Sequence, residues 1–183
     1  MELASIGPIP FCGMVLGDLG ADIVRVDRPT EVAGADPEQS GRNALDRGRR
    51  SIGVDLKHPD GVGVVLRLVE RADVLIEGFR PGVAERLGVG PDVCRSRNER
   101  LVYGRMTGWG RTGPLADRAG HDIDYIAIAG ALSAFGARGG PPTPPINVVG
   151  DFGGGGLLLA FGLLAALVER GTSGQGQVVD AAM

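Results

Sequence analysis

Short apolar runs of strand character alternate along the whole chain with segments of helical periodicity. The runs are rich in Val, Ile and Leu, which is typical of strands buried on both faces of a sheet. We expect strands at residues 22–26, 51–56, 74–77, 101–106 and 177–180, and the end of another at residues 2–4. We expect helices at residues 10–19, 59–71, 81–87, 91–100, 122–135 and 153–170. Strands separated by helices predict an α/β fold with a doubly wound, mostly parallel sheet.

Two segments show neither pattern. Residues 29–50 are polar and rich in Gly, Asp and Arg, so we expect a long loop there. The proline run at residues 141–145 predicts a stiff connecting loop, with a polyproline ligand as the alternative. Strand-like runs lie at both ends of the chain, and a buried strand at a terminus would leave an unprotected edge. We therefore expect the chain to be truncated at both ends.

Charge, cysteine content and hydropathy exclude several classes of protein. A net charge of −3 argues against a nucleic-acid binder that works by neutralising phosphates. Cys12 and Cys94 fit no metal or redox spacing, and the first residues lack the basic and apolar regions of a secretory signal, so we expect a cytoplasmic protein. The longest apolar stretch, residues 157–168, is shorter than the roughly 18 residues of a membrane span and predicts a buried core helix.

Three polar or glycine-rich stretches follow expected strands, at residues 55–57, 78–80 and 107–122. Ligands of doubly wound sheets bind at the carboxyl ends of strands, so these stretches are candidates for a binding site. A dinucleotide fingerprint and a Walker A loop are both absent from the sequence. The pattern therefore indicates a ligand held by scattered basic residues.

His121 and Asp151 are candidate acid–base groups. His121 lies at the expected start of a helix, whose positive end disfavours the protonated imidazole and suits a general base. A surface histidine or a simple helix cap is the alternative. Asp151 precedes four consecutive glycines, and either it is an N-cap or the segment requires close backbone approach. Free N–H groups there could hold an oxyanion, and helix packing at the glycines is the other interpretation.

Five segments together resemble the family III CoA-transferase superfamily, of CaiB/BaiF type. They are residues 16–27, 54–57, 73–82, 105–114 and 150–155, in an order that runs through nearly the whole chain. The resemblance implies a Rossmann-like, CoA-binding large domain, of which residues 1–183 are a part, with the second domain missing. It also implies an interlocked homodimer in which the partner subunit completes the site.

Within this superfamily the segment from Gly120 to Tyr125 is similar to the motif of the α-methylacyl-CoA racemases. The resemblance implies that His121 and Asp151 flank the α-carbon of a 2-methylacyl-CoA thioester and move its proton from one face to the other through an enolate. Related transferases lack the histidine and use the aspartate that matches Asp151 as an acyl-accepting nucleophile. A transferase and a CoA-binding or inactive fragment are therefore the alternatives.

Coenzyme A is implied as the carrier part of the substrate, with no metal and no tightly bound cofactor. Lys57 is the only lysine of the chain and falls inside a matching segment. Arginines are expected to meet the phosphates or to stack on adenine. The residues that the resemblance assigns to CoA are Arg28, Val54, Asp55, Leu56, Lys57, Gly78, Phe79, Arg80, Arg86, Gly120, Asp122, Ile123, Asp124 and Tyr125.

Overall fold

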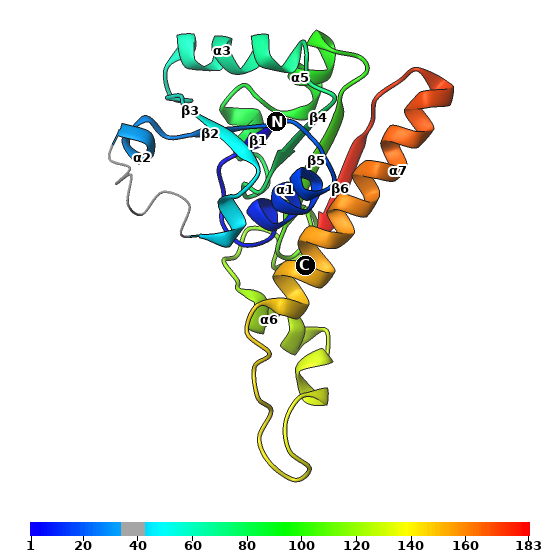
Figure 1. Ribbon diagram of the computed structural model, residues 1–183. Coiled ribbons are helices and arrows are strands. Elements are labelled where there is room, and N and C mark those ends of the chain that lie inside the picture. Colours follow the sequence, from blue (N-terminus) through cyan, green and yellow to red (C-terminus); the bar gives the residue numbers. More distant parts are fainter. Residues whose placement is uncertain (34–42) are drawn as a thin grey trace.

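The computed structural model describes residues 1–33 and 43–183, which form a six-stranded parallel sheet flanked by helices (Figure 1). The strand order is β3-β2-β1-β4-β5-β6. The strands are β1 (Glu2–Leu3), β2 (Ile23–Asp27), β3 (Arg49–Gly53), β4 (Val74–Glu77), β5 (Val102–Thr107) and β6 (Val178–Ala182). The helices are α1 (Pro8–Asp18), α2 (Pro29–Ala33), α3 (Pro59–Val69), α4 (Val83–Arg86), α5 (Pro91–Arg97), α6 (Asp122–Ile128) and α7 (Leu158–Ser173). The predicted α/β, doubly wound class is confirmed.

Three departures from the expected elements have local causes. The expected loop at residues 29–50 contains α2, a 3-10 helix η1 (Ala44–Asp46) and the first residues of β3, whose edge position and arginines hide the apolar pattern. Residues 34–42 of this segment lie outside the described residues. The expected helix at residues 122–135 stops after α6, because Gly130 takes a left-handed φ of 84° before the 3-10 helix η2 (Ala131–Ala134). The expected helix at residues 153–170 begins earlier, as the π-helix η3 (Val148–Leu157), which continues into α7.

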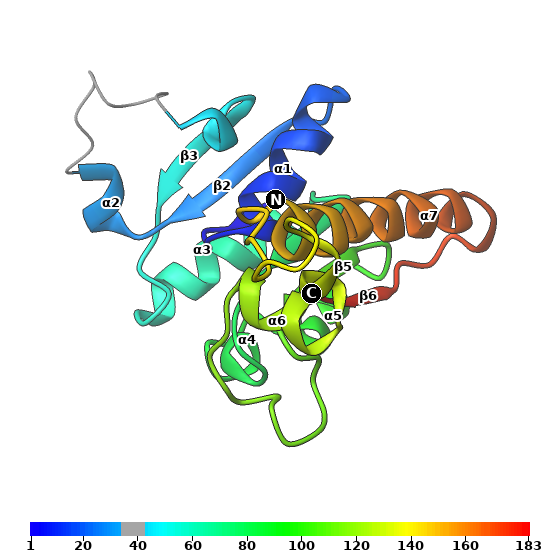
Figure 2. The same ribbon diagram turned by 90° about the horizontal axis from the view of Figure 1, so that it is seen from below.

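Two hydrophobic clusters cover opposite faces of the sheet. On one face, Val65 and Val69 of α3 and Cys94 of α5 pack against Leu75 and Tyr103 of the central strands. On the other face, α1 packs against α7, and α7 lies along β5 and β6 (Figure 2). The side chains of this cluster include Ile9, Cys12, Leu159, Leu163, Ile76 and Met106. The central strands β1, β4 and β5 are thus covered by helices on both sides, which explains their nearly continuous apolar runs in the sequence.

The position of α7 departs from the usual handedness of parallel sheets. Helix α1 leads from β1 to β2 in one direction along the sheet, and α7 leads from β5 to β6 in the opposite direction on the same face. The two connections therefore have opposite hands, whereas about 98% of such crossovers are right-handed. As a result, η3 packs on α1 at the carboxyl edge of the sheet. Between η2 and η3, the chain projects as an arm away from the sheet (bottom of Figure 1).

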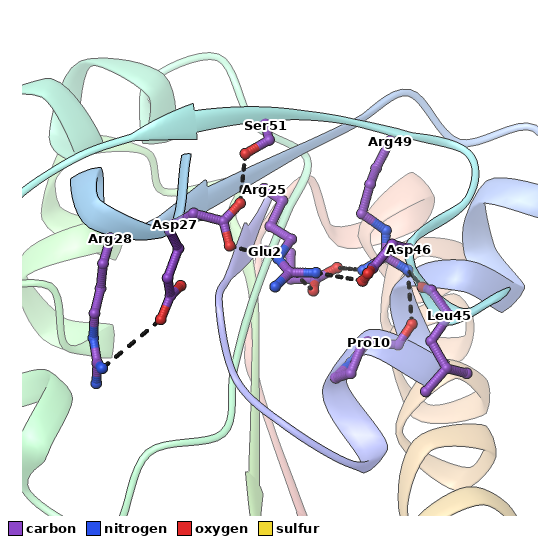
Figure 3. Close-up of polar contacts among 10 residues, drawn as sticks. Glu2, Pro10, Arg25, Asp27, Arg28, Leu45, Asp46, Arg49 and Ser51 are labelled. Carbon is purple, nitrogen blue, oxygen red and sulfur yellow. Dashed lines mark hydrogen bonds and ion pairs between the residues drawn. The ribbon is translucent and has the colours of Figure 1, made fainter. Parts of the chain in front are cut away.

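A buried ionic cluster ties β1, β2 and β3 together. Glu2 is fully buried and lies between Arg49 and Arg25, whose nitrogens are 2.5 and 3.9 Å from its carboxylate oxygens (Figure 3). Arg49 also donates to the carbonyl oxygens of Pro10 in α1 and Leu45 in η1. Burial raises the pKa of Glu2 to about 7, although both arginines favour its charged form. The cluster fixes the start of β3 beneath α1.

The continuous helical run from η3 through α7, Val148–Ser173, has 26 residues and is long and apolar enough to cross a membrane by length and composition alone. The apolar stretch judged too short in the sequence is therefore part of a longer helix. A third of the most apolar part is buried within the protein, including Leu159 and Leu163, while Phe161 and Val168 face outward. A core helix of a soluble protein meets the same criterion, and a single such helix is weak evidence for a span.

Candidate active site

A cavity of about 320 Å³ lies at the carboxyl ends of β1, β4, β5 and β6. Its walls come from the β1–α1 loop, the loop after β4, the end of β5 with the loop that follows, and η3. The strand order reverses between β1 and β4, so the cavity occupies the topological switch point where doubly wound sheets bind ligands. His121 and Asp151 both line it. The structure therefore brings the two candidate acid–base groups together, although they are 30 positions apart in the sequence.

Asp151 is the fourth residue of η3, and Asn147 is the N-cap, so the interpretation of Asp151 as an N-cap is wrong. A Cβ atom at Gly7 would lie 2.9 Å from the Oδ2 atom of Asp151, and Gly7 has a positive φ of 68°. The side-chain amide of Asn147 lies 3.5 Å from the same Oδ2 atom. Burial raises the pKa of Asp151, and the charge of Asp122 adds to this effect, while Asn147 and His121 oppose it.

The backbone N–H of Asp151 donates to the Oδ2 atom of Asp122 at 2.6 Å. Of the N–H groups around Asp151 that could hold an oxyanion, the one of Asp151 itself is thus already donated to a buried carboxylate. Asp122 is 5% exposed and does not line the cavity.

His121 is the N-cap of α6, at the helix start that the sequence predicted, and it is exposed toward solvent. Its backbone N–H donates to the Oδ2 atom of Asp124 at 2.9 Å, which holds the first turn of α6. Tyr125, one turn further on, packs edge-to-face on Trp109 with ring centroids 4.6 Å apart. A Cβ atom at Gly120 would come within 2.8 Å of both rings, so a glycine there allows the aromatic wall to pack beneath His121.

The glycine run after Asp151 serves helix packing. A Cβ atom at Gly155 would lie 3.0 Å from the Cβ atom of Pro8, and one at Gly156 would lie 2.5 Å from the Pro8 carbonyl oxygen. Both glycines are buried against α1. The close approach of η3 to α1 also brings Asp151 against Gly7. The packing of the glycines therefore positions the candidate acid as well.

Five of the residues assigned to CoA by resemblance line the cavity: Gly78, Phe79, Arg80, Gly120 and Tyr125. The others lie outside it. The side chain of Val54 is buried in the core, so only its backbone remains for a ligand, and Leu56 packs partly buried against the same core. Arg28 and Lys57 follow β2 and β3 at the same edge of the sheet and are exposed. The remaining residues outside the cavity are Asp55, Arg86, Asp122, Ile123 and Asp124. Contact of all fourteen with CoA stays a prediction.

Several residues of the cavity escaped the sequence analysis. Ser5 and Met183 line it without belonging to any motif, and Thr107 and Arg118 line it from the stretch 107–122, in which the sequence singled out neither of them. Glu77 at the end of β4 is only 2% exposed, and its carboxylate accepts the backbone N–H of Phe79 at 2.7 Å. Burial raises the pKa of Glu77 to about 7. The only signal in the sequence was a charged residue ending an apolar strand.

Within residues 1–33 and 43–183, no group of three or more His, Cys, Asp or Glu side chains is placed to hold a metal ion. The chemistry that the cavity offers is acid–base chemistry between an imidazole and a carboxyl group of raised pKa. One group can remove a proton from a bound molecule while the other supplies one.

Known proteins resemble the chain in sequence and structure. It is 49% identical to alpha-methylacyl-CoA racemase of Mus musculus and 48% identical to that of Homo sapiens, covering 100% of this chain and 46% of each relative. A CAIB/BAIF family protein from Brucella suis superimposes with a TM-score of 0.86 at 33% identity, covering 99% of this chain and 50% of that structure. Rv3272 from M. tuberculosis gives a TM-score of 0.83 at 37% identity, covering 99% and 51%.

The chain spans less than half the length of these racemases. The match covers every residue of this chain, the cavity and the candidate residues included. The family model described as CoA-transferase family III matches residues 1–183, and the chain therefore belongs to that family.

Proposed function

We propose that the protein containing this chain racemises 2-methylacyl-CoA thioesters. The observation that carries the proposal is the meeting of His121 and Asp151 in one cavity at the switch point of the sheet. Removing the α-proton from one face of the thioester and returning a proton to the other requires two acid–base groups. The relatives that are 48–49% identical carry the name alpha-methylacyl-CoA racemase, which supports the choice of reaction.

The reaction balances with these two groups alone. One group takes the α-proton as a base, leaving an enolate, and the other, protonated beforehand, donates its proton to the opposite face of the α-carbon. The pair ends with its proton exchanged between the two side chains. A raised pKa favours a protonated Asp151, so this carboxyl can serve as the donor for one enantiomer and as the base for the other.

Coenzyme A is the carrier part of the proposed substrate. Arg80 lines the cavity and supplies a cation close to the reacting groups, and Arg28 and Lys57 offer further cations along the same edge of the sheet. Guanidinium and ammonium groups bind the phosphates of such a ligand. We further propose that a second domain and a second copy of the protein complete the site, because His121 is exposed in the described structure.

Solvent exchange tests the reaction directly. Incubating a 2-methylacyl-CoA with the whole protein in deuterium oxide should place deuterium at the α-carbon, detected by mass spectrometry. His121→Ala and Asp151→Asn should each lower the exchange rate by roughly 10²- to 10⁴-fold. His58→Ala is the matched control, because the chain has two histidines and His58 caps α3 outside the cavity. Wild-type protein that incorporates no deuterium, or His121→Ala with undiminished exchange, would refute the proposal.

A transferase is the second candidate, and the observation that favours it is the position of Asp151 in the cavity. Relatives that are 36–38% identical carry CoA-transferase names, including succinyl-CoA–L-malate CoA-transferase of Chloroflexus aurantiacus. In that reaction the carboxylate attacks the thioester, CoA leaves and a mixed anhydride forms. Hydroxylamine trapping of an acyl group on Asp151, with CoA transfer surviving in His121→Ala, would decide for the transferase. Thioester binding without either reaction would indicate a CoA-binding fragment.

A further inference from the structure

The Asp122 carboxylate connects the two candidate catalytic residues although it does not line the cavity. It follows His121 directly, and its Oδ2 atom accepts the backbone N–H of Asp151 at 2.6 Å. The two aspartates are 29 positions apart, on α6 and η3. A Cβ atom at Gly150 would lie 2.8 Å from the same Oδ2 atom, so the backbone of η3 approaches this carboxylate closely.

Because the Asp122 carboxylate is buried, its hydrogen bond from the Asp151 N–H is important for stability. Asp122 is 5% exposed, and within the described residues its Oδ1 atom has no hydrogen-bond partner. A buried carboxylate is unfavourable unless it is hydrogen-bonded, and a bond to a charged acceptor contributes more than a neutral one. Among the described residues, the hydrogen bond from the Asp151 N–H therefore carries most of the compensation for burying the Asp122 carboxylate. Its loss would free the start of η3 from α6.

We infer that Asp122 is a positioning residue that acts on the reaction through the main chain of Asp151. By holding this N–H, the carboxylate fixes the turn of η3 that carries the Asp151 side chain against Gly7 and into the cavity. It also withdraws this N–H from any role as an oxyanion donor. The inference rests on the proposed function in one respect, namely that Asp151 is a reacting acid. It reassigns Asp122, which the resemblance gave to CoA, from binding to positioning.

Asp122 also has an electrostatic effect, on the pKa of Asp151. The titratable groups that face Asp151 are His121 and Asp122 at the start of α6 and Tyr125 within it, and Asn147 of its own helix is the neutral donor. The charge of Asp122 raises the pKa of Asp151. A neutral residue of the same shape at position 122 should therefore keep the geometry and lower this pKa.

Two substitutions separate the geometric effect from the electrostatic one. In Asp122→Asn the side-chain carbonyl still accepts the Asp151 N–H, so kcat for exchange should stay within a few-fold of wild type, and the acid limb of the pH profile should move to lower pH. In Asp122→Ala the acceptor is lost, and kcat should fall on the order of 10- to 100-fold. The KM for the thioester should stay unchanged in both. Asp92→Asn, at an exposed acid of α5 that does not line the cavity, is the control and should leave the pH profile unchanged.

A spectroscopic measurement makes the test independent of the reaction. The Asp151 amide should be protected from hydrogen exchange in wild type and in Asp122→Asn, and it should lose protection in Asp122→Ala; if Asp122→Ala fails to fold, Asp122→Asn alone decides through its pH profile. An unshifted acid limb in Asp122→Asn, or a raised KM with unchanged kcat, would overturn the inference. A wild-type protein without deuterium incorporation would instead overturn the proposed function, and the amide measurement would still report on the contact.

Discussion

Replacing Glu77 by Gln should remove a pH dependence from the stability of the protein. Glu77 is almost fully buried at the end of β4, and burial is the main cause that raises its pKa from 4.5 to about 7; nearby Glu85 adds to the rise. The hydrogen bond from Phe79 and the charges of Arg111 and Arg105 oppose the rise without cancelling it. Glutamine is neutral at every pH and can accept the same N–H, so it reproduces the protonated side chain.

The sign and size follow from linkage. Because the folded state binds the Glu77 proton more tightly than the unfolded state does, the stabilising contribution is full below pH 4.5 and is lost as the pH rises to 7. Each unit of pKa difference is worth about 1.4 kcal/mol, so the rise from 4.5 to about 7 corresponds to about 3 kcal/mol. The free energy of unfolding of wild type, taken relative to Glu77→Gln, should fall by about this amount between pH 4 and pH 8.

Urea denaturation at a series of pH values measures this difference. Both proteins share every other titrating group, so their difference isolates Glu77 even though the buried Glu2 titrates in the same range. Glu99→Gln, at an exposed position, should follow the pH dependence of wild type and is the control. A difference between wild type and Glu77→Gln that is constant with pH, or that grows as the pH rises, would show that the carboxylate is not destabilised by burial.

Two further substitutions test contacts of the fold and the site. Arg49→Ala leaves Glu2 buried without its closest cation and should lower the free energy of unfolding by about 3–5 kcal/mol in urea denaturation at pH 8; a loss below 1 kcal/mol would contradict the role of the cluster. Gly7→Ala forces a strained backbone and a Cβ atom against Asp151, so it should lose about 1–3 kcal/mol of stability and most of the α-proton exchange. Gly20→Ala, with a φ of 99° and open space around it, should lose stability by thermal melting and keep exchange; equal exchange in both variants would contradict the positioning of Asp151 by Gly7.

Local patterns predicted most of the fold because they coincide with burial. Residues 74–77 were expected as a strand and form β4, since helices cover both faces and every residue there is apolar or ends the strand. The start of β3 was missed because Arg49 is satisfied by Glu2 and two carbonyl oxygens, a tertiary arrangement that leaves no local pattern. The π-helical geometry of η3 had no signal beyond its glycines.

In the candidate site, too, local patterns identified some residues, while a tertiary contact left no pattern in the sequence. His121 and Asp151 were accessible from the sequence because each lies where a loop meets a helix near the carboxyl end of a strand. The link from Asp122 to the Asp151 backbone was not, because it depends on how α6 and η3 approach one another after the projecting arm. For the same reason, a buried positioning carboxylate and a ligand-binding one could not be distinguished at Asp122.

The unusual connection between β5 and β6 affects whether activity or sheet structure is lost first on heating. His121 and Asp151 both lie in the connection between β5 and β6. The two strands themselves are paired, and the side chain of Arg105 in β5 also donates to that of Asp180 in β6, 75 residues away in the sequence. Helix α6 packs mainly on η2 and η3, whereas η3 is also held by α1 and α7, so α6 can open before the global transition. Detachment of α6 would displace His121 and release the Asp151 N–H together, and would leave β1 to β5 paired. Under mild heating, activity should therefore disappear before the circular dichroism of the sheet changes.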